Sequence, residues 1–225
     1  MSYLGLITYL ALKSKKFIPN RPLYFFAFIT GSVFPDLYKF ILYFQNIFNN
    51  TDFPNITHSL FSLTMIHLLF LAYHEIKKDE SILNFAYGFS MGFILHVILD
   101  VILDLNGINI FWPIPIPEIS LLSYFNNILI IKNYIISIEF IFFRLFAYQI
   151  NQIILKNPNK NENNINDLNK FMKISTYFLI TSVLVAIFLP HIHDTIYKLF
   201  YMISYGVSIY LLYRARDSFE ERLSK

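Results

Sequence analysis

The chain has 225 residues, of which 56% are apolar and 15% are charged, and its mean hydropathy is +0.49. An average soluble domain is about 45–50% apolar and about 25% charged, so this composition excludes an ordinary water-soluble enzyme. The absence of cysteine excludes disulfides, thiol catalysis and thiolate metal sites. The six glycines form neither a GxGxxG motif nor a P-loop, and the net charge of +3 is too small for nucleic-acid binding.

Apolar stretches that are long enough to cross a membrane recur along the chain, with prolines between them. A spanning helix needs about 20 mostly apolar residues. The sequence predicts such helices over residues 57–76, 82–105, 134–155, 172–189 and 196–213. Two shorter apolar segments precede them, at 3–12 and 22–35, and the first is interpreted as an interfacial helix. The polar stretch 156–170 is predicted to be a solvated loop.

These segments predict an all-α fold, a polytopic transmembrane bundle of about 5–7 membrane helices with short interfacial helices. We expect one membrane-embedded domain over residues 1–225. Basic residues predict its orientation, because cytoplasmic loops are enriched in Lys and Arg. Of the 18 Lys and Arg residues, 14 fall on the loops of one side, and the other side carries Lys39, Lys132 and Lys198. The C-terminus is therefore predicted to be cytoplasmic.

Ionisable side chains near the ends of the predicted spans form one cluster of metal-ligand type. Such groups are costly in a membrane and are candidates for function. His96 and Asp100 are four residues apart, so they share one helix face. His58 lies about 20 residues before the turn at 77–81 and Asp100 about 20 after it, so both stand about 30 Å from that turn. Asp36 ends a short apolar segment on the same side, and imidazole with carboxylate suits zinc, manganese or iron.

A plainer interpretation makes each of these residues a boundary residue that meets water. His58 would then belong to an ordinary helix cap together with Thr57 or Ser59. His67 and His74 lie about 180° and about 160° around the helix from His58, at about 100° per residue. We therefore interpret these two histidines as packing residues.

Other polar and small residues support weaker expectations. Gly88 and Gly92 form a GxxxG motif, which allows close contact between helices. The segment 190–194 contains two histidines and an aspartate, and we expect a solvated loop that could add metal ligands. Asp104 and Glu139 are candidate general bases, because each carboxylate stands near the end of a predicted span.

Four short motifs follow one another within residues 1–117: Gly31–Asp36 with its Pro-Asp, Thr57-His58-Ser59, His96-xxx-Asp100, and Gly107 followed by Trp112-Pro113. Their order and spacing resemble the YdjM-like family of inner-membrane proteins, a LexA-regulated family inferred to consist of metal-dependent hydrolases. Residues 1–117 would be the family-like core, and 118–225 would add membrane helices.

The resemblance implies that Asp36, His58, His96 and Asp100 bind a divalent metal ion, zinc first, with manganese or iron as alternatives. The family is distantly similar to zinc-dependent phospholipase C and nuclease folds. This similarity implies a phosphoester or lipid-like substrate, with membrane lipids as partners. Tyr9 stands where the family usually has a histidine, and Tyr38 where it has a second aspartate.

Three functions are compatible with these residues. The first is a membrane-bound metal-dependent hydrolase acting at the membrane interface, with Asp104 or Glu139 as the general base. The second is a transporter, in which carboxylates and histidines form a cation path, although that predicts polar residues through the full depth of the membrane. The third is a non-catalytic membrane protein with a degenerate metal site, which Tyr9 and Tyr38 favour.

Overall fold

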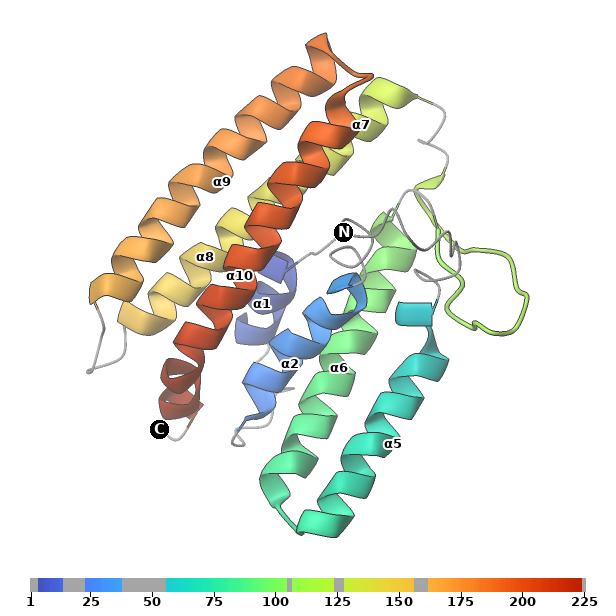
Figure 1. Ribbon diagram of the computed structural model, residues 1–225, viewed down its shortest axis with the longest axis vertical. Coiled ribbons are helices and arrows are strands. Elements are labelled where there is room, and N and C mark those ends of the chain that lie inside the picture. Colours follow the sequence, from blue (N-terminus) through green and yellow to red (C-terminus); the bar gives the residue numbers. More distant parts are fainter. Residues whose placement is uncertain are drawn as a thin grey trace. The chain divides into compact units, whose positions relative to one another are not determined.

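The computed structural model describes residues 4–13, 23–37, 56–104, 107–123, 128–155 and 162–223. In these ranges the chain is helical apart from its connections, with a single β-bridge between Ile108 and Ile119 and no strand. The predicted all-α class is confirmed. Two compact units make up the chain (Figure 1): residues 19–124 form the first, and residues 2–18 with 125–225 form the second. The single membrane-embedded domain expected over 1–225 stays a prediction.

In its described residues, the first unit contains a helical hairpin and one shorter helix. The hairpin consists of α5 (Leu60–Lys77) and α6 (Glu80–Leu103). Its turn is closed by Lys78, in the left-handed conformation at φ 53°, and by Asp79, whose side chain accepts a hydrogen bond from the Ser81 amide at 2.8 Å. Because this turn is so short, α5 and α6 are antiparallel neighbours, as the sequence predicts (Figure 1).

The shorter helix, α2 (Tyr24–Val33), packs along α6 and continues into a 3-10 turn, η1 (Phe34–Leu37). Glycine makes this close packing possible. A Cβ atom on Gly92 would lie 1.8 Å from the carbonyl oxygen of Phe28, and one on Gly31 would lie 2.0 Å from that of Phe89. Since backbone atoms cannot move aside, only glycine fits, and the packing interpretation of the GxxxG motif is confirmed.

Over the residues that are described, the second unit is a bundle of five helices. They are α1 (Leu4–Lys13), α7 (Leu129–Ser137), α8 (Glu139–Leu155), α9 (Glu162–Phe188) and α10 (His193–Leu223). The helices α8, α9 and α10 pack against one another, and α1 packs on α8 (Figure 1). Phenylalanine and tyrosine side chains fill the bundle: the rings of Phe178 and Phe200 stack with centroids 4.2 Å apart. The predicted helix over 134–155 begins earlier and is interrupted at Ile138.

The predicted solvated loop at 156–170 is wrong for residues 162–170, which form the first turns of α9. Leu168 and Phe171 are 1% and 3% exposed, and their spacing of three places them on one helix face. Asp167 also pairs with Arg214 of α10 at 2.9 Å. Two buried apolar residues and an ion pair therefore outweigh the polar composition of the segment. Residues 156–161 lie outside the described ranges.

Three of the described helices are long and apolar enough to cross a membrane. They are α6 over Glu80–Leu103, α9 over Ile165–Phe188 and α10 over His193–Ala215. The apolar segment Tyr24–Leu37 is shorter. The helices therefore support a membrane protein, while the predicted number of crossings and the cytoplasmic C-terminus stay predictions.

Candidate metal centre

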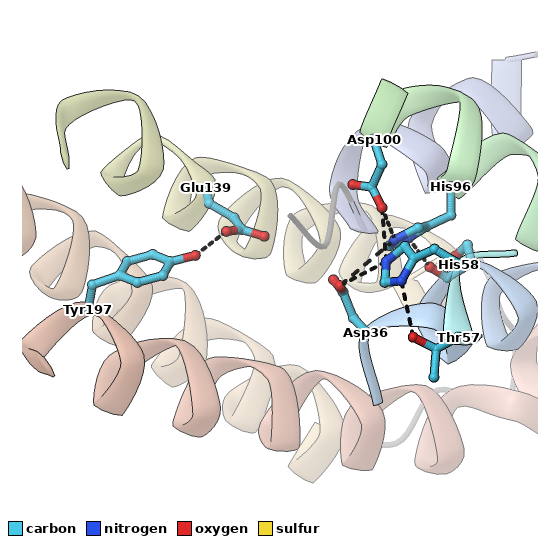
Figure 2. Close-up of polar contacts among 8 residues, drawn as sticks. Asp36, Thr57, His58, His96, Asp100, Glu139 and Tyr197 are labelled. Carbon is cyan, nitrogen blue, oxygen red and sulfur yellow. Dashed lines mark hydrogen bonds and ion pairs between the residues drawn. The ribbon is translucent and has the colours of Figure 1, made fainter. Parts of the chain in front are cut away.

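Four side chains from three separate segments of the first unit point toward one another (Figure 2). Asp36 belongs to η1, His58 stands just before α5, and His96 and Asp100 lie one turn apart on α6. Asp36, His96 and Asp100 are 0% exposed and His58 is 3% exposed. These four residues form a candidate cation site, and in that sense we call them the metal centre.

The distances suit a small cation. Oδ2 of Asp100 lies 3.0 Å from Nε2 of His58 and 2.9 Å from Nε2 of His96. Oδ1 of Asp36 lies 3.8 Å from each of the same two nitrogens. Ligand atoms around a tetrahedral zinc ion, with bonds of about 2.0–2.1 Å, stand about 3.3 Å apart. The observed separations lie on both sides of that value, and Asp36, His58 and His96 together can hold a metal ion.

Hydrogen bonds behind the two imidazole rings set their orientation. Nδ1 of His96 donates to the backbone oxygen of Ser32 at 2.6 Å. Because a carbonyl oxygen only accepts, the proton is on Nδ1 and the lone pair of Nε2 is directed to the metal centre. Nδ1 of His58 lies 3.1 Å from Oγ1 of Thr57. Metal-binding histidines usually have this kind of second hydrogen bond.

The N-terminal cap of α5 positions the imidazole ring of His58. Ser59 is the N-cap of α5, and its hydroxyl oxygen accepts a hydrogen bond from the Ser62 amide at 3.1 Å. The Ser59 hydroxyl also donates to the backbone oxygen of Ile56 at 2.9 Å. The capping interpretation is thus confirmed for Ser59. It does not replace the metal interpretation, because the cap leaves His58 in the turn before the helix, directed to Asp100.

The charges of the metal centre favour a cation. A buried carboxylate is costly unless it is paired or coordinates a metal ion, and Asp36 and Asp100 are both fully buried. Neutral imidazole is the form of histidine that binds metals. Two carboxylates and two imidazoles therefore match a divalent ion in charge and in ligand chemistry.

The two candidate general bases have different surroundings. Asp104 is the C-cap residue of α6: its amide donates to the backbone oxygen of Asp100 at 2.8 Å, and its own backbone oxygen accepts from the Ser120 hydroxyl. Glu139 belongs to the second unit, is 1% exposed, and accepts a hydrogen bond from the Tyr197 hydroxyl (Figure 2). The catalytic role of either carboxylate stays a prediction.

The histidines set aside as packing residues have structural partners within the hairpin. Nδ1 of His67 lies 2.8 Å from Oγ of Ser90, so it links α5 to α6. Nδ1 of His74 donates to the backbone oxygen of Asp79 at 2.9 Å, beside the turn. Both interpretations are confirmed.

The expected solvated loop at 190–194 is wrong for one of its histidines. His191 is exposed, but His193 is 1% exposed, and its Nε2 lies 2.8 Å from Oγ of Ser137 and 3.0 Å from Oγ of Ser182. The sequence gives no signal for this contact, because it joins α7, α9 and α10, which only the fold brings together.

Two tyrosines stand where the resemblance leads us to expect metal-ligand residues, and the structure describes one of them. Tyr9, which stands where a histidine was expected, is on α1 of the second unit and is 42% exposed. Tyr38, which stands where a second aspartate was expected, lies outside the described residues. The contribution of Ser32 to the metal centre was not predicted, because a backbone oxygen leaves no signal in the residue type.

Comparison with known proteins agrees with the motifs. No curated protein and no solved structure matches the chain significantly. Residues 2–189 match the family described as YdjM inner membrane protein, a range that contains the whole metal centre and continues through α9. Because this match covers far more than half of the sequence, the chain belongs to the YdjM family of inner-membrane proteins.

Proposed function

We propose that the protein is a membrane-bound, metal-dependent hydrolase that acts at the membrane interface on a phosphoester or lipid-like substrate. One observation carries this proposal: two imidazole nitrogens and two carboxylates from three segments meet in a buried site at one end of a membrane-type helix. Burial of four such groups together is costly, and cation binding offsets that cost.

Asp36, His58, His96 and Asp100 are the proposed ligands. A divalent ion held by these residues would lower the pKa of a bound water and polarise the scissile group. The ring of His96 is held in place by the Ser32 carbonyl, so it needs little rearrangement to bind. Zinc is the first expectation: imidazole and carboxylate are its usual ligands, three of these groups with a water complete a tetrahedral catalytic site, and a fourth makes it five-coordinate. Manganese or iron are the alternatives.

A general base completes the proposed chemistry. Asp104 is the first candidate, because it follows Asp100 by one helical turn, is only half-buried, and lies in the same unit as the metal centre. Glu139 is the second candidate, and the Tyr197 hydroxyl holds its carboxylate in place. Such a base would accept a proton from the attacking water.

The first test is the metal content of the purified protein. Elemental mass spectrometry of the wild type should find about one zinc, manganese or iron ion per chain, as one four-ligand site requires. The His96→Ala/Asp100→Ala variant should lose it. His74→Ala is the matched control, since it removes an imidazole from the same hairpin away from the metal centre and should keep the ion. Absence of metal from reloaded wild-type protein would contradict the proposal.

Hydrolysis is tested separately, on phospholipids and phosphomonoesters, with the metal-loaded protein and with the protein after a chelator has removed its metal.

The alternative function is a non-catalytic or transport-type membrane protein with a degenerate site, and the tyrosine at position 9 favours it. That alternative predicts bound metal without turnover, or cation flux in proteoliposomes. Turnover that disappears on chelation and in Asp104→Asn would favour the hydrolase and its first-choice base.

A further inference from the structure

The connection after α6 is an ordered loop over residues 107–123, which we call the apolar loop. Ile108 and Ile119 form its neck, with amide–carbonyl hydrogen bonds of 3.3 and 3.0 Å. Asn109 fixes its tip, because its side-chain amide donates to the Ile114 oxygen at 2.9 Å and its side-chain oxygen accepts from the Phe111 amide at 3.1 Å. The loop thus has a defined shape without a helix or a strand.

This ordered loop presents apolar side chains to its surroundings. The exposed ones are Phe111, Ile114, Ile116, Ile119 and Leu121, with exposures from 37% to 67%. Glu118 is its single charged residue, and three prolines remove backbone N–H groups that would otherwise need partners in an apolar medium. An ordered loop of this composition is poorly suited to water, where contiguous apolar surface favours association.

The apolar loop is anchored beside the metal centre at two points. The Leu60 amide, two residues after His58, donates to the Ile110 oxygen at 2.9 Å. The Leu121 amide donates to the oxygen of Val101, which directly follows Asp100, at 3.0 Å. The loop and the metal centre therefore occupy the same end of the α5–α6 hairpin.

Apolar surface continues from the loop onto α5. The ring of Trp112 meets that of Phe61 edge to face, with centroids 6.0 Å apart, and Phe61 is itself 50% exposed. The loop also starts only four residues after Leu103, where the membrane-type helix α6 ends. Tryptophan is enriched where a membrane meets water, because its ring is apolar and its N–H is polar.

We propose that the apolar loop inserts into the interfacial region of the lipid bilayer, next to the metal centre. The partner is the lipid of the adjacent leaflet, since the loop continues the apolar surface of a spanning helix and carries one charge in 17 residues. The consequence for the substrate rests on the proposed function: a hydrolase held in this way receives an amphiphile from the bilayer, and not a solute from the water.

Trp112 is the single tryptophan of the chain, so the native protein carries its own probe within the loop. We would reconstitute the full chain into phosphatidylcholine vesicles with brominated acyl chains, and measure quenching of Trp112 emission. Bromine near the headgroup end of the chain should quench more strongly than bromine near the methyl end. Iodide in the water should quench weakly, and the emission maximum should be blue-shifted.

Two variants supply the depth references. Trp112→Phe/Lys77→Trp moves the probe to the exposed end of α5, where iodide should quench strongly. Trp112→Phe/Met91→Trp moves it to the middle of α6 at a site that is 49% exposed, where deep bromine should quench best. The proposal is supported if bromine near the headgroup end quenches Trp112 most strongly, and if this depth profile differs from those of both reference variants.

Two results would overturn the proposal that the apolar loop inserts into the bilayer. Strong iodide quenching without bromine quenching would place the loop in water. Protection from both quenchers would mean that protein covers it, whether another part of this chain, a second copy or a partner. The measurement needs neither bound metal nor turnover, so its failure leaves the hydrolase proposal standing, and loss of metal binding does not change its outcome.

Discussion

At the scale of single residues, the metal centre and its immediate surroundings contain two kinds of group. Asp36, His58, His96 and Asp100 present ligand atoms, whereas Thr57 and Ser32 contact the far side of the imidazole rings. Loss of an orienting partner costs about 10–100-fold in metal affinity, and loss of a ligand costs more. The two kinds of group can therefore be told apart by the size of the effect.

Thr57→Val should weaken zinc binding by about 10-fold, because the hydroxyl beside His58 Nδ1 is lost while the shape is kept. Asp100→Asn should weaken it by more than about 100-fold, because Oδ2 of Asp100 is the oxygen nearest to both imidazoles. Competition with a chromophoric chelator measures both affinities. Thr64→Val is the control, since that hydroxyl bonds only within α5 at Leu60, and it should bind zinc like the wild type. Equal losses in Thr57→Val and Asp100→Asn would contradict the distinction.

The sequence predicts which residues of the metal centre come together wherever a simple geometric rule applies. The four-residue spacing puts His96 and Asp100 on one helix face, and equal distances from a tight turn bring His58 to the level of Asp100. No such rule predicts the Ser32 carbonyl, which depends on how closely α2 approaches α6. Nor does one predict His193, whose serine partners belong to two other helices.

At the scale of elements, the approach of α2 to α6 determines whether the metal centre can form. The crossing holds Ser32 behind His96, and η1 then carries Asp36 into the cluster. Gly31 and Gly92 permit this distance, because each faces a backbone carbonyl of the other helix. The GxxxG spacing on α6 predicts close packing but does not identify the partner helix.

Gly92→Ala should separate α2 from α6, because the added methyl would lie 1.8 Å from the Phe28 oxygen. Overpacking of this kind costs about 1–3 kcal/mol, so the thermal midpoint in detergent should fall. Metal content should fall with it, since Asp36 and the Ser32 carbonyl move with α2. Met91→Ala is the neighbouring control: Met91 is 49% exposed, and neither value should change. Full metal content in Gly92→Ala would show that α2 contributes no ligand.

The junction of α7, α9 and α10 gives a contrasting prediction. His193→Ala would leave the buried hydroxyls of Ser137 and Ser182 without their imidazole, at a cost of about 1–3 kcal/mol. We expect a lower thermal midpoint and an unchanged metal content, because those contacts engage His193 within the second unit. Metal loss from a variant that is still folded by circular dichroism would instead make His193 a ligand.

For the whole molecule, the charge pattern predicts which side of the membrane carries the metal centre. The hairpin turn holds Lys77 and Lys78, and the metal centre lies at the opposite ends of α5 and α6. The excess of Lys and Arg on the loops of one side predicts that this turn is cytoplasmic. The metal centre and the apolar loop would then face the outer leaflet. Helix packing alone is the same in either orientation, so only the charge pattern predicts this.

Single-cysteine variants test the orientation directly, because the chain has no cysteine of its own. Ile192→Cys lies between α9 and α10 at a site that is 48% exposed, and it should react with a membrane-impermeant maleimide applied to spheroplasts. Lys77→Cys, exposed at the hairpin turn, should react only after lysis. Reaction of both variants in lysed cells controls for access to the thiol. If Lys77→Cys reacts in spheroplasts and Ile192→Cys does not, the chain is inverted, the metal centre faces the cytoplasm, and the lipid-like substrate proposed for it would come from the inner leaflet.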